Sequence, residues 1–331
     1  MARNENLHKA KTNKNDVFFT GDYDVEQELR FYWPHFKDKV ILMNCNDILD
    51  EEGTGSAFWR YFRQRHDILG FKEIIATHYN PDGPSFGMRY DGVNETRFEL
   101  QGHGEFDDEE CIELLKESDI VITNPPFSRF SHGFVDTLMK FEKKFLIIGP
   151  LLAITYKEFF PYLKNDQVWL GVNANKTMQF VMPEDYELKG KAYIDDNGNK
   201  IGFVPGITWY TNIDNRRRNE KLFLVETYAG NEQHYPKYDN YDAINVDKCR
   251  EIPKDYYGVM GVPISFMCVY NPEQFEVLGG FNNYKPDTAD TSFQIYGEAV
   301  PVMSTKSLFR GPVVHKTAKA FRVLIRRRWA S

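Results

Sequence analysis

Cysteine is scarce in this chain, and the residues that occur lie far apart. Cys45, Cys111, Cys249 and Cys268 form no Cys-x-x-Cys pair. Neither a metal site nor a disulfide framework is therefore indicated, and a reducing compartment suits the composition. The sequence shows no secretory leader and no apolar run long enough to cross a bilayer, so we expect a soluble, cytoplasmic protein with no membrane partner.

Acidic residues are missing from the last part of the chain, although the protein as a whole is acidic. The formal net charge is −7, which by itself argues mildly against nucleic acid as a partner. No Asp or Glu follows Glu298, whereas Arg326, Arg327 and Arg328 do. A second basic cluster comprises Arg216, Arg217 and Arg218. Basic patches on an acidic body are compatible with DNA binding, and a solvated surface is the alternative for either cluster.

The apolar residues are sufficient for a large folded core. Hydrophobic residues make up 42% of the 331 positions and aromatic residues 15%. Up to about residue 174, short β-branched runs alternate with segments of helical period, which predicts a doubly wound, mostly parallel α/β sheet. Beyond that point turn residues become frequent, and the stretch 195–199 predicts a hairpin between two short apolar runs.

The same patterns predict individual elements. We expect strands at 40–43, 73–79, 119–123, 145–148 and 168–172, and helices at 24–36, 58–68, 109–116, 130–144 and 156–163. Residues from about 215 onward read as an irregular α+β region, because helix-period segments thin out there.

The most informative stretch is Asn124-Pro125-Pro126-Phe127, directly after the predicted strand 119–123. Neither proline has an N–H for a strand ladder, so the strand must stop there. The segment therefore forms a stiff corner at the carboxyl end of a strand, where open α/β sheets place their ligand sites. A plain Pro-Pro turn that ends a strand is the structural alternative.

This corner suits methyl transfer to an amino group on a flat ring. The lone pair of such an amine is delocalised into the ring and makes a poor nucleophile. The side-chain carbonyl of Asn124 and the backbone carbonyl of Pro125 can each accept one amine hydrogen, and Phe127 can stack on the ring. Catalysis would then consist of positioning and fixed dipoles, without a strong base.

Several segments in order resemble the EcoRI-type family of adenine-specific DNA methyltransferases. Asn-Pro-Pro-Phe is typical of amino-methyltransferases that use S-adenosylmethionine, and specifies only the chemistry. The supporting segments are 16–20, 36–40, 104–106, 209–214 and 260–266. Together they cover most of the chain and specify the family.

The resemblance implies a fold, a domain order and partners. It implies a Rossmann-like methyltransferase sheet with an antiparallel edge strand over residues 16–214, after a basic arm at 1–15. Residues 215–331 are then the target-recognition region. Double-stranded DNA is the implied partner, in a restriction-modification or phage context. A restriction endonuclease that acts on the same site, without direct contact, would suit the restriction setting.

Cofactor contacts follow from the resemblance, except where the first motif departs from the common pattern. Many methyltransferases carry Gly-x-Gly after the first strand, but here the sequence continues with four other residues: Asn44, Cys45, Asn46 and Asp47. Asp47 or Asn44 can bind the methionine amino group of S-adenosylmethionine, while a simple Asx turn is the alternative. Phe18 and Thr20 are expected near its methionine end, or else Thr20 caps the first helix.

Glu105 and Phe106 are expected beside the cofactor adenine, the acid for its amine and the aromatic for its ring. Alternatively, Phe106 is a core residue and Glu105 a surface acid. Adenine N6 is unreachable inside a duplex, so the target base must flip out. Phe127 can stack on one face of it, and Trp209 or Tyr210 on the other, unless these two are core residues. The basic clusters would then contact phosphates.

Other activities remain open on the sequence alone. A methyltransferase for an RNA base or a protein glutamine would share the chemistry, but such enzymes more often carry Tyr in place of Phe127 and lack the long carboxyl-terminal extension. A catalytically inactive DNA-binding relic is a third reading, which the intact Asn124-Pro125-Pro126-Phe127 segment argues against.

Overall fold

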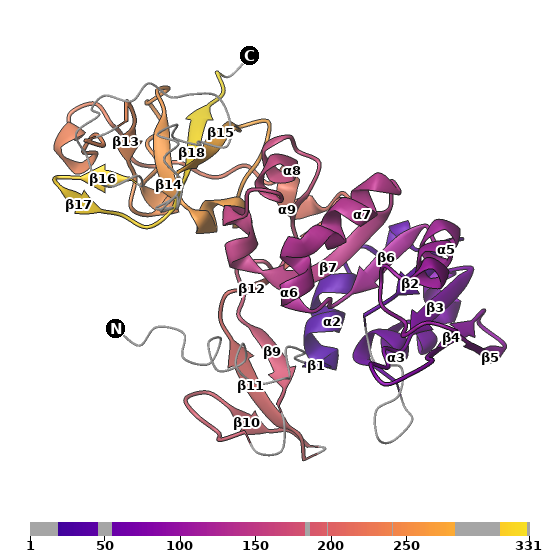
Figure 1. Cartoon of the computed structure of the whole chain (residues 1–331). Helices are drawn as coiled ribbons and strands as arrows, with labels where there is room; N and C mark the ends of the chain where they lie inside the picture. Colours follow the sequence, from indigo (N-terminus) through magenta and orange to yellow (C-terminus); the bar gives the residue numbers. More distant parts are fainter. Residues whose placement is uncertain are drawn as a thin grey trace. The chain divides into compact units, whose positions relative to one another are not determined.

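The chain forms two compact units, as a computed structural model shows (Figure 1). The structure describes residues 19–45, 55–182, 186–196, 198–239, 241–281 and 312–329. The first unit extends to Leu151 and resumes from Gly171 to Asn215, while the second holds Leu152–Leu170 and the chain from Arg216 onward. Residues 152–170, which the sequence placed with the methyltransferase domain, thus cluster with the second unit. No helix in the described ranges is long and apolar enough to span a membrane.

The first unit is built on a mixed sheet with strand order β5-β4-β3-β2-β6-β7-β12. Its parallel centre consists of β3 (Glu73–Thr77), β2 (Val40–Met43), β6 (Ile120–Thr123) and β7 (Lys144–Pro150). The antiparallel members are β12 (Ile207–Thr211), next to β7, and the hairpin of β4 (Phe86–Tyr90) and β5 (Glu95–Glu99), next to β3. The predicted methyltransferase sheet with an antiparallel strand is confirmed.

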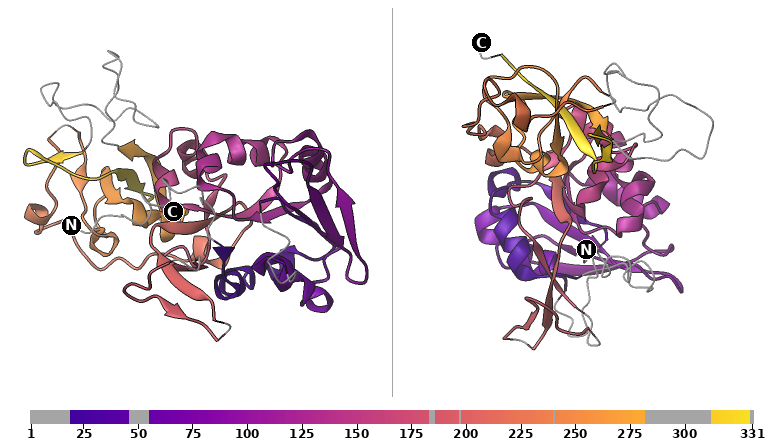
Figure 2. Two further views of the ribbon diagram at one scale, coloured as in Figure 1. Left: turned by 60° about the horizontal axis from the view of Figure 1, so that its bottom comes forward. Right: turned by 90° about the vertical axis from the view of Figure 1, so that its left-hand side faces the viewer.

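Helices cover both faces of this sheet, the indigo ones on one side and the magenta ones on the other (Figure 2). They are α2 (Asp22–Leu29), α3 (Ala57–Arg63), α4 (His66–Leu69), α5 (Glu109–Glu117), α6 (Phe127–Arg129) and α7 (Val135–Lys140). The expected helix at 24–36 ends early, because Pro34 follows in a short 3-10 turn, Trp33–His35, and cannot continue an α-helix. The expected helix at 130–144 begins earlier and is interrupted by a π-helical turn, Phe130–Phe134.

A second sheet of the first unit runs in the order β1-β9-β11-β10. Its strands are β1 (Phe19–Thr20), β9 (Met178–Val181), β11 (Lys200–Val204) and β10 (Tyr193–Ile194). The predicted hairpin is the β10–β11 pair, whose turn is closed by Asp195 accepting from the Asn199 N–H at 2.8 Å. Because β9 pairs with β1, this sheet fixes the position of Thr20.

The second unit contains a smaller sheet with strand order β13-β14-β18-β15 and a short β16–β17 pair. The strands are β13 (Ile244–Asn245), β14 (Met260–Pro263), β18 (Arg322–Arg327), β15 (Phe275–Phe281), β16 (Val313–Val314) and β17 (Thr317–Ala318). Other short elements are α8 (Phe160–Lys164), β8 (Trp169–Leu170) and α9 (Arg216–Asn219), with 3-10 turns at Glu232–His234, Cys249–Glu251 and Ile264–Cys268. This mixture matches the irregular α+β pattern expected from the sequence.

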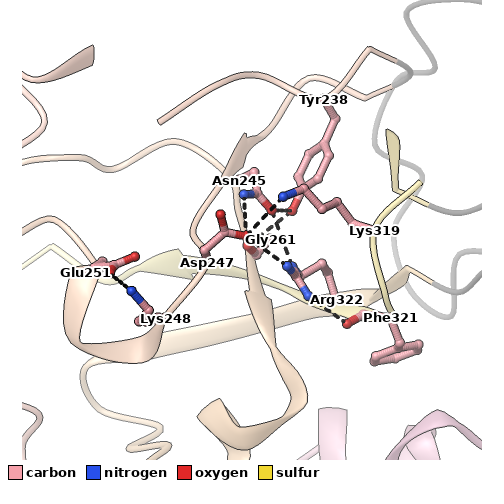
Figure 3. A network of polar contacts seen from close by, with 9 residues as sticks. All are labelled: Tyr238, Asn245, Asp247, Lys248, Glu251, Gly261, Lys319, Phe321 and Arg322. Carbon is pink, nitrogen blue, oxygen red and sulfur yellow. Dashed lines mark hydrogen bonds and ion pairs between the residues drawn. The ribbon is translucent and has the colours of Figure 1, made fainter. Parts of the chain in front are cut away.

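A buried polar network ties three strands of that sheet together (Figure 3). The Tyr238 hydroxyl donates to Asn245 Oδ1 at 2.9 Å, and a side chain at Gly261 would collide with it, since an added Cβ would lie 2.2 Å from that hydroxyl. Arg322 Nε donates to the same Asn245 oxygen at 3.3 Å, and its Nη2 to Asp247 Oδ1 at 3.1 Å. Gly261, in the 260–266 segment, therefore leaves the room that the Tyr238 ring occupies.

Candidate active site

The Asn-Pro-Pro-Phe segment ends a fully buried strand and begins a helix. All residues of β6 are buried, and Asn124 and Pro125 continue that burial. Pro126 precedes α6, and its carbonyl accepts from the Arg129 N–H at 2.9 Å. Phe127 is half-buried at the start of α6 and packs against the core. The segment is therefore a rigid corner, as its prolines predict.

Asn124 is held by a residue far away in the sequence. Asn124 is buried, with 6% of the residue exposed. Its side-chain nitrogen Nδ2 donates a hydrogen bond to Thr20 Oγ1 at 3.1 Å. This contact orients the side-chain amide. Because the nitrogen is engaged with Thr20, the carbonyl oxygen is the group through which Asn124 can bind an amine.

The end of the neighbouring strand β2 meets the end of β6. Asn44 is buried, with 4% exposed, and Cys45 Sγ lies 3.6 Å from Asn44 Oδ1. The Cys45 thiol also hydrogen-bonds to Thr123, and burial raises its pKa to about 12. Cys45 therefore stays a neutral thiol at physiological pH and is no nucleophile. Phe18, Asn46 and Asp47, also expected at the cofactor, lie outside the described residues.

The Gly104-Glu105-Phe106 segment has a fixed backbone. Gly104 adopts a φ of +79°, and an added Cβ would lie 2.1 Å from the carbonyl oxygen of His78. Only glycine tolerates that combination without strain. The Asp108 carboxylate accepts from the N–H groups of Gly104 at 2.9 Å and of Glu105 at 3.0 Å. The position of Glu105 is thus set by its own loop.

The side chains of this segment point toward the helix that follows Asn124. Arg129 Nη2 lies 2.5 Å from Glu105 Oε2, and the Tyr79 phenol also hydrogen-bonds to Glu105. Phe106 is 7% exposed and packs edge-to-face on Phe134, with ring centroids 5.0 Å apart. Sequence reasoning missed Arg129 and Tyr79. A basic residue two positions after Phe127 and an aromatic at the end of a strand were the available signals.

Trp209 and Tyr210, expected to stack on the target base, are buried in the core with 1% and 0% exposed. They lie on opposite faces of β12, and helices cover both faces. Trp209 packs edge-to-face on Phe58, with centroids 6.0 Å apart, and Tyr210 packs on Phe130 at 5.3 Å. Neither ring offers a face to a base in this arrangement, so their burial favours the core alternative.

The first basic cluster is engaged within the second unit to different degrees. Arg218 stacks over the Trp169 ring at 3.7 Å and pairs with Asp166 at 3.5 Å. Arg217 Nε donates to the Cys268 carbonyl at 3.3 Å. Arg216 is exposed. The cluster therefore combines two structural arginines with one that faces solvent.

The second basic cluster is largely tied to its own sheet. Arg326 pairs with Glu276 at 3.0 Å, and Arg328 Nε donates to the Pro272 carbonyl at 2.7 Å. Arg327 lies over the Tyr257 ring at 4.9 Å. Trp329, which is 75% exposed, stacks on Tyr257 with centroids 3.8 Å apart. The sequence did not single out this aromatic pair.

Known proteins resemble this chain over almost its entire length. The family described as "Adenine-specific methyltransferase EcoRI" matches residues 6–328. This chain belongs to that family. It is therefore an enzyme, a DNA adenine methyltransferase, and the fold and family expected from the sequence are confirmed.

Individual relatives support the assignment. Type II methyltransferase M.EcoRI of Escherichia coli is 46% identical over 297 residues, which cover 84% of this chain and 89% of the relative. M.MpnI of Mycoplasma pneumoniae is 40% identical over 275 residues, 82% of this chain and 84% of the relative. M.MgeORF184P of Mycoplasma genitalium is 39% identical over the same length, 82% of this chain and 85% of the relative. The comparison with solved structures found no match to this chain.

Proposed function

We propose that this enzyme transfers a methyl group from S-adenosylmethionine to the N6 amine of an adenine flipped out of duplex DNA at a specific site. The observation that carries the proposal is Asn124 at the end of β6, buried and oriented through its nitrogen by Thr20. In this orientation its carbonyl oxygen is the acceptor for one amine hydrogen. The Pro125 carbonyl accepts the other.

Two fixed acceptors make the amine a better nucleophile. They draw its hydrogens to one side, so that the nitrogen becomes more tetrahedral and its lone pair leaves the ring system. No strong base is required, because the dipoles are set before the substrate arrives. The half-buried Phe127 ring supports the proposal as a stacking surface for the adenine.

The residues at the carboxyl ends of β2 and β6 fit a nucleoside cofactor. S-Adenosylmethionine supplies an electrophilic methyl group on a sulfonium. Thr20 and Asn44 offer a hydroxyl and an amide for its methionine end, and Glu105 and Phe106 offer an acid and a ring edge for its adenine. Gly104, whose positive φ and close approach to the His78 carbonyl leave no room for a Cβ, holds the turn that presents Glu105 and Phe106.

DNA recognition is proposed for the second unit. Arg216 is exposed, and the Arg326–Arg328 run lies beside the exposed Trp329. Arg216, which is exposed, and Arg327, which lies over the Tyr257 ring on which Trp329 stacks, are the strongest candidates for phosphate contacts. Since several relatives are Type II methyltransferases, a restriction endonuclease that cuts the same site is the partner we propose, acting through the DNA without direct contact.

One labelling experiment tests the proposed function. Methyl-labelled S-adenosylmethionine is incubated with the protein and with duplex DNA, RNA or a protein mixture in turn. We expect label in DNA alone, recovered after hydrolysis as N6-methyladenine, and sequencing of the product then gives the recognition site. Label confined to RNA or protein, or label in cytosine, would contradict the proposal.

A further inference from the structure

Arg129 connects the two halves of the candidate active site. It lies in the short helix α6, and its backbone N–H is bonded to the Pro126 carbonyl, so it is attached directly to the Asn-Pro-Pro-Phe corner. Its guanidinium pairs with Glu105 at 2.5 Å and lies 5.9 Å from the Phe106 ring centroid. A single side chain therefore bridges the base-binding corner and the segment proposed to hold the cofactor adenine.

Glu105, the ion-pair partner of Arg129, has a fixed backbone. Asp108 fixes the backbone of Glu105, and the positive φ of Gly104 fixes the turn before it. The ion pair thus joins two rigid segments rather than two mobile side chains. A displacement of Glu105 when a nucleoside binds against it would pass through the guanidinium to the first turn of α6.

We propose that Arg129 is a positioning residue, which couples cofactor binding at Glu105 and Phe106 to the alignment of Asn124 and Phe127. The inference rests on the proposed function and adds a residue to it. Arg129 touches neither the amine nor the methyl group in this proposal. It sets the first turn of α6, and hence the angle at which Phe127 and the Pro125 carbonyl meet the base.

Stability and catalysis should respond differently if this is correct. Arg129 and Glu105 side chains are 41% and 29% exposed, so their ion pair contributes little to folding, as is usual for pairs near the surface. A purely structural pair would therefore have little effect on either property. A coupling pair would have little effect on unfolding but a clear effect on methyl transfer, because a small misplacement of reacting groups slows reactions strongly.

The test compares Arg129→Ala with a matched control in the same unit. Arg63 and Glu95 form an ion pair at 3.0 Å with 53% and 32% of their side chains exposed, between α3 and β5. Arg63→Ala removes a comparable pair away from the site. Thermal unfolding, equilibrium binding of S-adenosylmethionine and single-turnover methylation at saturating cofactor are measured for both variants.

We expect both variants to unfold at similar temperatures, and Arg129→Ala alone to lose about tenfold or more in single-turnover rate. Glu105→Gln should lose a similar factor, and the double variant no more than either single one, since the residues act as one unit. Arg129→Lys, which keeps the charge, should recover part of the rate. A duplex that carries 2-aminopurine at the target adenine reports base flipping by its fluorescence. Any change in this fluorescence that the cofactor produces with the parent protein should be absent with Arg129→Ala.

Two results would overturn the inference. One is a rate for Arg129→Ala equal to that of Arg63→Ala. The other is a set of losses that simply add in the double variant, which would show that Arg129 and Glu105 act separately. If the parent protein itself transfers no methyl group to adenine, the proposed function fails, and this inference with it. An active parent with a normal Arg129→Ala variant refutes the inference alone.

Discussion

Replacing Asn124 by Ala tests the proposed chemistry most directly. The change removes the Oδ1 acceptor for the amine and the Nδ2 donor to Thr20, which lies 3.1 Å away. Loss of one hydrogen bond in a buried setting costs about 1–2 kcal/mol of stability, so the protein should still fold. Loss of a preorganised acceptor should slow methyl transfer by about 10²–10³-fold.

The assay is single-turnover methylation of a duplex at saturating cofactor, with cofactor affinity measured separately. Affinity should change little, because Asn124 faces the base in this proposal rather than the cofactor. The matched control is Thr20→Val, which removes the acceptor for the Asn124 nitrogen but keeps the carbonyl oxygen of Asn124. We expect it to cost only about fivefold in rate, the equivalent of one ordinary hydrogen bond of about 1 kcal/mol.

Two outcomes would refute the reasoning about Asn124. Near-normal turnover in Asn124→Ala would mean that the carbonyl oxygen does not bind the reacting amine. An equally large loss in Thr20→Val, with the affinity for S-adenosylmethionine unchanged, would mean that Asn124 matters only through its contact with β1. In either case the acceptor role would have to move to another group at the end of β6.

Three further predictions concern other parts of the molecule. Gly104→Ala should lower the free energy of unfolding in urea by about 1–2 kcal/mol or more, because a positive φ disfavours any side chain and the new Cβ would meet the His78 carbonyl. An unchanged urea midpoint would contradict this account of the turn. Burial raises the pKa of Asp24 from 3.8 to about 6. The stability that Asp24 contributes is therefore complete below about pH 4 and is lost as the pH rises through 6. As the pH rises through that window, the free energy of unfolding of Asp24→Asn should increase relative to that of the parent by at most about 3 kcal/mol. Parallel curves of unfolding free energy against pH for the two proteins would contradict this prediction. Arg216→Ala should reduce the salt dependence of DNA binding by about one phosphate contact, whereas Arg218→Ala should chiefly destabilise the second unit; equal salt slopes for parent and Arg216→Ala would remove Arg216 from the interface.

The strands of the central sheet could be predicted because burial on both faces leaves an uninterrupted apolar run. Residues 40–43 match β2, and 119–123 differ from β6 by one residue. Helix ends were harder, since the helix expected at 24–36 ends at Leu29, before the turn that contains Pro34. The assignment of Leu152–Leu170 to the second unit had no sequence signal, because it depends on which distant elements those residues contact.

The aromatic residues of β12 show why a site residue and a core residue can look alike in sequence. Trp209 and Tyr210 follow a strand pattern that suits either role. Their burial depends on whether helices cover both faces of an antiparallel strand, and they do. The same holds for the arginine clusters, where nearby carboxylates and carbonyls from other strands decide which guanidinium groups are engaged.

The sequence by itself determined the chemistry and the family, because the chemistry depends on a contiguous corner of four residues whose prolines dictate the local backbone. Tertiary structure decided which side chains orient that corner. Thr20 meets Asn124 across 104 positions, and Arg129 meets Glu105 across 24. Such pairs depend on strand order and register, and local sequence patterns carry no information about either.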